Sequence, residues 1–261
     1  FNPVVDDWDK WIDDYEKRHS ANGEKILNNI YDRDTINKHF KSISKHDFPI
    51  TEESIKSVPD IIIDDFNQEQ NVKINIYRRK LLEDMQQYDT GIEGAYSIPL
   101  TISDNAVFVL GEYGKTKIAD LDTMYYAVHN HPDNGVLTIT DLYRFLERGK
   151  MVGLEAITNG GKNVTVITKT LNSDPDEYTK YLDSCLNEFT KKHPNIDIEK
   201  DFDLVNDFFA EILKEAKKYG YRTIIEWWIW WYVWYWAYQK RIKRLKDIEK
   251  MEEMIKNEDI R

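Results

Sequence analysis

The chain has 261 residues, of which 41% are hydrophobic and 32% charged, and its formal net charge is −11. This composition excludes a collagen, a wholly disordered chain and a polytopic membrane protein, and the acidic balance argues against a surface that coats DNA or RNA. A single cysteine, Cys185, excludes a disulfide within the chain, so we expect a reducing, cytoplasmic compartment. Because the chain begins with Phe1, we also expect it to be a fragment of a longer protein.

The first third of the chain, residues 1–88, is predicted to be a helical N-terminal extension of unknown function. Apolar residues between positions 71 and 87 recur at helical spacing and predict a helix that leads into the next unit. The run Ile61-Ile62-Ile63 fits either a helix or a strand. No motif of known chemistry lies in this region.

Residues 89–172 are predicted to form a separate domain of mixed α/β or α+β class. Short β-rich segments are predicted at 95–98, 107–110, 124–128, 153–158 and 163–168, and a helix is predicted at 140–148. Asn159-Gly160-Gly161, between the last two of these strands, is typical of a tight hairpin turn. The pattern predicts a small sheet-and-helix domain that is flanked by helical extensions.

The remaining chain is predicted to be helical. Residues 173–220 fit one or two amphipathic helices that end at Gly220, and residues 221–261 fit an aromatic-rich and then mixed-charge C-terminal helix. Residues 224–238 hold six of the eight tryptophans. This segment fits packing or self-association, contact with a membrane surface, or a transmembrane anchor, although it is shorter than the ~20 apolar residues of a spanning helix.

The segment from His129 to Asp141 contains the candidate metal ligands of the chain. His129 and His131 are two residues apart at the end of a predicted strand, so their rings point to the same side. Pro132 and Gly135 predict a turn that can return Asp141 to the same point at the start of a helix. Two histidines, one aspartate and an open position are the ligand set of a catalytic zinc ion.

These residues resemble a known signature. His-x-His-Pro, a short turn, Thr138, two residues and Asp141 resemble the MPN/JAMM metalloprotease motif, over roughly residues 90–170. The His-Asn-His-Pro form looks most like the RadC-like branch and related domains of phage and mobile-element proteins. The resemblance implies a cytidine-deaminase-like sheet-and-helix fold and a zinc-dependent peptidase or isopeptidase with a protein or peptide substrate.

The resemblance also implies roles for single residues. His129, His131 and Asp141 would hold Zn²⁺, and an upstream glutamate would serve as general acid and base. Glu93 is our choice for that glutamate because it begins the first β segment, and Glu112 is the competitor, in what reads as a turn.

The hydroxyl position of the motif departs from the family. The family usually has a serine that donates a hydrogen bond to the oxyanion, and Thr138 stands at that place here. The threonine keeps the hydroxyl group and adds a methyl group, so we expect metal binding to be unaffected.

Two other interpretations of the motif stay open at this point. The histidines could simply end a strand and hydrogen-bond the turn. The domain could also be a non-catalytic or DNA-linked RadC-like module, serving as a structural component of a phage or mobile element, although the net charge disfavours nucleic acid as a partner.

Overall fold

The computed structural model describes residues 47–114, 116–197 and 200–226, which all belong to one compact unit that ends at Glu226. The predictions for residues 1–46, and those for the aromatic-rich and mixed-charge segment from 227 to 261, lie outside the described residues.

The described residues form a mixed α/β fold, as predicted, around one six-stranded sheet. The strands are β1 (Ile92–Pro99), β2 (Val107–Tyr113), β3 (Tyr125–His131), β4 (Met151–Thr158), β5 (Val164–Thr168) and β6 (Arg222–Glu226). The helices are α4 (Glu52–Lys56), α5 (Gln68–Met85), α6 (Ile139–Glu147), α7 (Pro175–Lys192) and α8 (Phe202–Glu215), with a 3₁₀ turn, η2 (Ala216–Tyr219), after α8. The strand order is β2-β1-β3-β4-β5-β6, and only β3 and β4 run parallel to each other.

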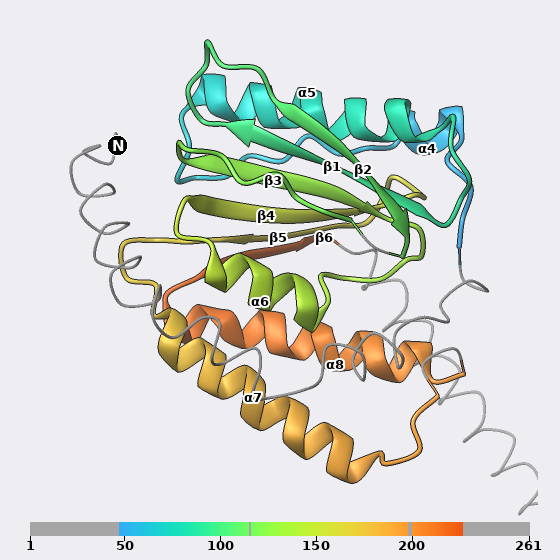
Figure 1. The fold of residues 1–261 in the computed structure, drawn as a ribbon, viewed down its shortest axis with the longest axis vertical. Coiled ribbons are helices and arrows are strands. Elements are labelled where there is room, and N and C mark those ends of the chain that lie inside the picture. Colours follow the sequence, from blue (N-terminus) through green and yellow to red (C-terminus); the bar gives the residue numbers. More distant parts are fainter. Residues whose placement is uncertain (1–46, 115, 198–199, 227–261) are drawn as a thin grey trace, which may run out of the picture. The chain divides into compact units, whose positions relative to one another are not determined.

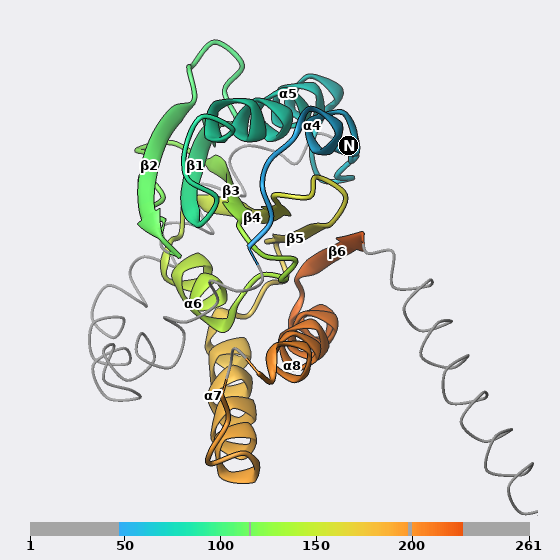
Figure 2. The ribbon, with the colours of Figure 1, turned by 90° about the vertical axis from the view of Figure 1, so that its right-hand side faces the viewer.

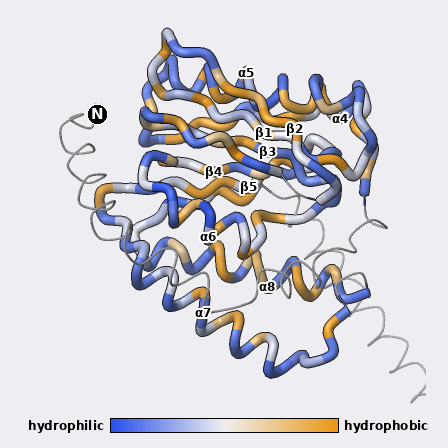
Figure 3. Tube along the Cα trace, viewed as in Figure 1, coloured by the Kyte–Doolittle hydropathy of each residue, from blue (hydrophilic) through white to orange (hydrophobic). Residues whose placement is uncertain are grey.

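The helices lie on both faces of the sheet (Figures 1 and 2). Helices α4 and α5 cover one face, and α6, α7 and α8 lie on the other. Colouring by hydropathy shows apolar residues gathered in the strands between these layers (Figure 3). Helix α5 also carries two apolar residues, Val72 and Ile76, that stay exposed. The layered arrangement therefore buries the sheet between two sets of helices.

The parallel pair β3 and β4 forms the centre of the core. Every residue of both strands is buried, whereas every residue of the edge strand β2 is exposed or only partly buried. Parallel neighbours need a crossover connection, and α6 supplies it between β3 and β4. The crossover begins directly after the carboxyl end of β3, where the two histidines stand.

Most elements predicted from periodicity are confirmed. The five strand segments and the helix predicted within residues 89–172 are present, with ends shifted by a few residues, and the predicted helix at 71–87 is α5. The prediction of one or two helices before Gly220 is met by two, α7 and α8. Gly220 ends η2 with φ of +81°, a left-handed conformation that glycine adopts without strain.

Two predictions of local structure are wrong. Arg222–Glu226, predicted as the start of the C-terminal helix at 221–261, form strand β6, which pairs antiparallel with β5. Thr223, Ile224 and Ile225 are β-branched and suit a strand, and an apolar run of this length does not distinguish a strand from a helix. Glu112, predicted to lie in a turn, belongs to strand β2.

The run of three isoleucines is neither helix nor strand. Asn75 of α5 accepts a hydrogen bond from the main-chain N of Ile61 at 3.0 Å and donates one to its carbonyl oxygen at 3.1 Å. Asn71 does the same for Ile63, at 2.8 and 3.1 Å. These side-chain amides satisfy the main chain in place of a neighbouring strand, so that Ile61 and Ile63 are buried while Ile62 is 75% exposed.

A buried ion pair joins α5 to the centre of the sheet. Arg78 and Glu155, on α5 and β4, have no exposed side-chain surface. The guanidinium donates to both carboxylate oxygens of Glu155, from Nη2 at 2.7 Å and from Nε, and the hydroxyl of Tyr126 donates to Oε2 at 2.6 Å. Because each partner satisfies the other, the pair tolerates burial that an isolated charge would not.

Breaking this pair should strongly destabilise the fold. We expect Arg78→Met to lower the free energy of unfolding by about 3–5 kcal/mol, because Glu155 would be left as an uncompensated buried charge. Denaturant unfolding monitored by circular dichroism measures the effect. The matched control is Arg79→Met, which removes an exposed pair with Asp60 and should cost at most about 1 kcal/mol. Equal losses for the two variants would contradict the assigned role of Arg78.

Within residues 47–226, no helix is both long enough and apolar enough to cross a membrane.

Candidate metal site

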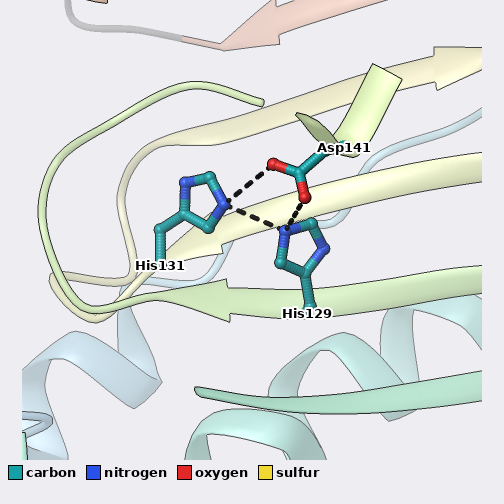
Figure 4. A group of neighbouring side chains, drawn as sticks. All are labelled: His129, His131 and Asp141. Carbon is teal, nitrogen blue, oxygen red and sulfur yellow. Dashed lines mark hydrogen bonds and ion pairs between the residues drawn. The ribbon is translucent and has the colours of Figure 1, made fainter. Parts of the chain in front are cut away.

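The two histidines of the motif project from the same face of β3. Tyr126 and Val128 pack into the core that includes residues of α5. Because successive side chains of a strand point to opposite faces, His129 and His131 project toward the other face, where α6 begins (Figure 4). The strand therefore places both rings beneath the start of the crossover helix.

Asp141 reaches the histidines from the first turn of α6. Thr138 is the N-cap of this helix, and its hydroxyl donates to Asp141 Oδ2 at 2.7 Å while it accepts from the main-chain N of Asp141 at 3.3 Å. The main-chain N of Thr138 also donates to Oδ2, at 2.9 Å. A carboxylate is favoured at a helix N-terminus as well, by the positive end of the helix dipole. The capping box thus fixes the orientation of Asp141.

This arrangement gives Thr138 an orienting role, because its hydroxyl group is engaged with Asp141. Its implied function as a donor to an oxyanion stays a prediction.

Three ligand atoms converge on one point. His129 Nε2 lies 2.9 Å from His131 Nε2, and Asp141 lies 3.6 Å from the first ring through Oδ1 and 3.4 Å from the second through Oδ2 (Figure 4). Ligands at the usual bond lengths of a tetrahedral zinc ion are about 3.3–3.6 Å apart. The two aspartate distances fall in this range, each from a different carboxylate oxygen, and a small separation of the rings would bring in the distance between the two histidines. The buried group could therefore hold a metal ion.

The outer ring nitrogens of the two histidines differ in their surroundings. His131 Nδ1 lies 3.3 Å from the carbonyl oxygen of Gly135, a contact that suits an Nδ1–H donor and leaves Nε2 for a metal. His129 Nδ1 is buried and has no hydrogen-bond partner within the described residues. The carbonyl group of Gly135 therefore favours the neutral tautomer of His131 that carries its hydrogen on Nδ1.

The charges of the three residues are strongly coupled. Burial lowers the pKa of His129 and is only partly opposed by Asp141. Burial also acts on His131, but the hydrogen bond to Asp141 and the negative charges of Asp141 and Glu93 outweigh it and raise the pKa of His131 to about 9. The two histidines hold the pKa of Asp141 well below its usual range in spite of its burial.

Glu93 lies across from this group on the neighbouring strand. β1 pairs antiparallel with β3, and Ala95 stands opposite His129. Continuing the register by two residues places Glu93 opposite His131 and on the same face of the sheet.

The electrostatics of Glu93 agree with this position. Burial raises the pKa of Glu93 to about 8; His131 opposes the shift, and Asp141 and Asp133 add to it. Glu112, the competing candidate, is exposed on the edge strand β2. Of the two glutamates, Glu93 is therefore the one that interacts with the candidate metal ligands.

Asn130 holds the main chain on both sides of Glu93. Its Oδ1 accepts from the main-chain N of Gly94 at 2.6 Å, and its Nδ2 donates to the carbonyl oxygen of Ile92 at 3.2 Å. Nδ2 also donates to Asn159 Oδ1 at 2.9 Å. The pairing of β1 with β2 is irregular between Ile92 and Gly94, so the side chain of Asn130 supports the strand where its ladder is interrupted.

Sequence reasoning missed several residues of the site. Asn130, Arg144 and Thr158 are not predicted to belong to the site, and Asn159 is predicted only as part of a hairpin turn. Alternation along β3 could have placed Asn130 on the face opposite the histidines. The hydroxyl of Thr158, which stands opposite His131 in the parallel pair with β4, is buried without a hydrogen-bond partner in the described part of the chain; the sequence carries no signal for it.

Compared with known proteins, the chain matches no family model, no curated protein and no solved structure.

Metal binding should depend on pH because a proton competes for His131. With its pKa raised to about 9, His131 is protonated at neutral pH without metal, and the metal must displace that proton. We expect the apparent affinity for Zn²⁺ to fall about tenfold for each pH unit below 9 and to level off above it. Calorimetry in buffers of different ionisation enthalpy should show the release of about one proton at pH 7. Zinc affinity that is constant between pH 6 and 8 would contradict this assignment.

Substituting the residue between the two histidines should leave the metal bound. Asn130→Ala removes hydrogen bonds to the main chain around Glu93, so we expect a loss of about 1–3 kcal/mol in the free energy of unfolding. Zinc stoichiometry should stay at one per chain, because Asn130 points away from the ligands. The control is His129→Ala, which should abolish stoichiometric binding; loss of zinc from both variants alike would contradict the described orientation of Asn130.

Proposed function

We propose that the chain is a zinc-dependent metallohydrolase of MPN/JAMM type that cuts peptide or isopeptide bonds. The observation that carries the proposal is the convergence of His129, His131 and Asp141 on one point, with Glu93 opposite on the adjacent strand. A buried cluster of three ligand side chains is what a catalytic zinc site needs, since a fourth position is left for the reactants.

The donor set fits zinc by its chemistry. Two imidazole nitrogens and one carboxylate suit Zn²⁺ better than Mg²⁺ or Ca²⁺, which prefer oxygen ligands alone. When bound, zinc supplies Lewis-acid polarisation of a carbonyl group and a more acidic water.

Glu93 is the residue to which we assign the proton transfer. Its carboxylate can accept a proton from the attacking water and return it to the nitrogen of the leaving amine, which restores the carboxylate for the next cycle. A pKa of about 8, raised mainly by burial, lies near neutral pH, where a group serves well both as base and as acid. Thr138 keeps Asp141 oriented through the capping box.

The first test is the metal content of the purified protein, measured by elemental mass spectrometry. We expect about one zinc ion per chain, and none in His131→Ala, because a site with two remaining protein ligands holds zinc weakly. Absence of metal from the wild-type protein, even after zinc is supplied, would overturn the proposed site.

The second test separates binding from catalysis. Glu93→Gln should retain zinc and lose hydrolysis of peptide or isopeptide substrates by about 10²–10⁴-fold, because the amide cannot accept the proton. Glu112→Gln is the matched control and should leave the rate unchanged, since Glu112 is exposed on β2. Full activity of Glu93→Gln would overturn the assignment of the acid–base residue.

A further inference from the structure

Arg144 lies beside the candidate metal site. It follows Asp141 by three residues on α6 and is therefore on the same side of the helix. Side chains three residues apart on a helix are neighbours, so Arg144 lies beside the candidate ligand Asp141. In agreement with this position, its positive charge opposes the burial that raises the pKa of Glu93 and adds to the burial that lowers the pKa of His129.

A comparison with the next arginine of the same segment shows what is unusual about Arg144. Arg144 Nη1 donates to the carbonyl oxygen of Thr116 at 3.1 Å, and Arg148 Nη1 donates to that of Ile118 at 3.0 Å. Arg148 Nε also lies 3.7 Å from Oδ2 of Asp120. Arg144 forms no ion pair with any carboxylate of the described residues. Both arginines hold the same loop, but only Arg148 has its charge matched by an acid.

The hydroxyl group of Thr116, next to Arg144, lacks a hydrogen-bond partner among the described residues. Thr116, whose carbonyl oxygen Arg144 binds, is 3% exposed, and its hydroxyl Oγ1 is buried with no hydrogen-bond partner in the part of the chain that the structure describes. A buried hydroxyl left without a hydrogen-bond partner costs about 1–3 kcal/mol, so binding a ligand atom there would be favourable.

We propose that Arg144, together with the Thr116 hydroxyl, binds a carboxylate of the substrate next to the bond that is cut. A guanidinium presents parallel N–H donors that match the two oxygens of a carboxylate, and a hydroxyl adds a further donor. The inference rests on the proposed hydrolase function and names its substrate class: peptides with an acidic group, either an acidic side chain or a free C-terminal carboxylate, near the scissile bond.

The negative charges of the site make this position selective. Asp133 and Asp141 both interact electrostatically with Glu93, and their carboxylates would repel a substrate carboxylate that entered elsewhere in the site. Besides His131, Arg144 is a cation whose charge lowers the pKa of Glu93. An acidic substrate would therefore be bound in one orientation, with its carboxylate at Arg144.

The test measures binding on zinc-loaded Glu93→Gln protein, so that the peptides stay intact. Three probes are titrated by calorimetry: acetyl-Ala-Ala-Asp-Ala-amide, the neutral acetyl-Ala-Ala-Asn-Ala-amide, and the Asn peptide with a free C-terminal carboxylate. We expect at least one acidic probe to bind about tenfold more tightly than the neutral one, in keeping with a charge-assisted pair. Which acidic probe is preferred distinguishes the two sources of the carboxylate.

Variants in the same background assign the preference to its residues. Arg144→Gln should abolish the difference between acidic and neutral probes, Arg144→Lys should retain part of it, and Thr116→Val should reduce it. Arg148→Gln is the matched control and should leave the ratio of affinities unchanged. The ratio does not respond to a loss of stability alone, which would weaken all three probes together.

Equal affinity for the three probes, absence of binding by any of them, or a preference that survives in Arg144→Gln would each overturn the inference. Failure of the proposed function gives a different result. If wild-type protein with zinc binds an acidic probe through Arg144 but cuts none of the peptides, carboxylate recognition stands and hydrolysis is excluded for these peptides.

Discussion

The parallel pairing of β3 with β4 is the constraint on which the rest of the structure depends. Two parallel strands cannot be joined by a tight turn, so the chain must leave the end of β3, cross one face of the sheet and return. The helix that makes this crossing necessarily begins beside the carboxyl end of β3. Its first turn thereby brings Asp141 over the rings of His129 and His131, and the topology assembles the site from one short stretch of sequence.

The opposite face of the sheet supplies rigidity. Arg78 of α5 reaches Glu155 of β4, and Tyr126 of β3 binds the same carboxylate, so one buried network ties a helix to both members of the parallel pair. On the site face, the imidazolium of His131 and the carboxylate of Asp141 attract each other across 3.4 Å. The internal ion pair keeps these two ligands together before any metal enters, at the cost of a proton that competes with it.

The sequence predicts those parts of the fold that depend on neighbours along the chain. Local signals predict the strand that ends in His129 and His131, the capped start of α6 and the hairpin at Asn159-Gly160-Gly161. Contacts between residues that are distant in sequence cannot be predicted in this way. No pattern links Arg78 to Glu155, and the isoleucines at 61–63 avoid both helix and strand only because asparagines of α5 satisfy their main chain. Likewise, β6 becomes a strand because the edge of β5 accepts it.

Asn130 and Asn159 hold the start of β1 and parts of the chain that precede it, which has a consequence for how this protein can vary. The two amides bind main-chain atoms of Phe48, Thr90, Ile92 and Gly94, and no side chain of these four residues takes part in the bonds. Main-chain groups are the same in nearly every residue. These hydrogen bonds therefore place no demand on the side chains of the residues they hold, whereas they require both asparagines. Packing sets a separate limit at Gly94, where a Cβ would clash with the side chain of Met85. Divergent copies of this fold could therefore keep the two asparagines, the glycine and the carboxylate of Glu93 while other side chains of this stretch change.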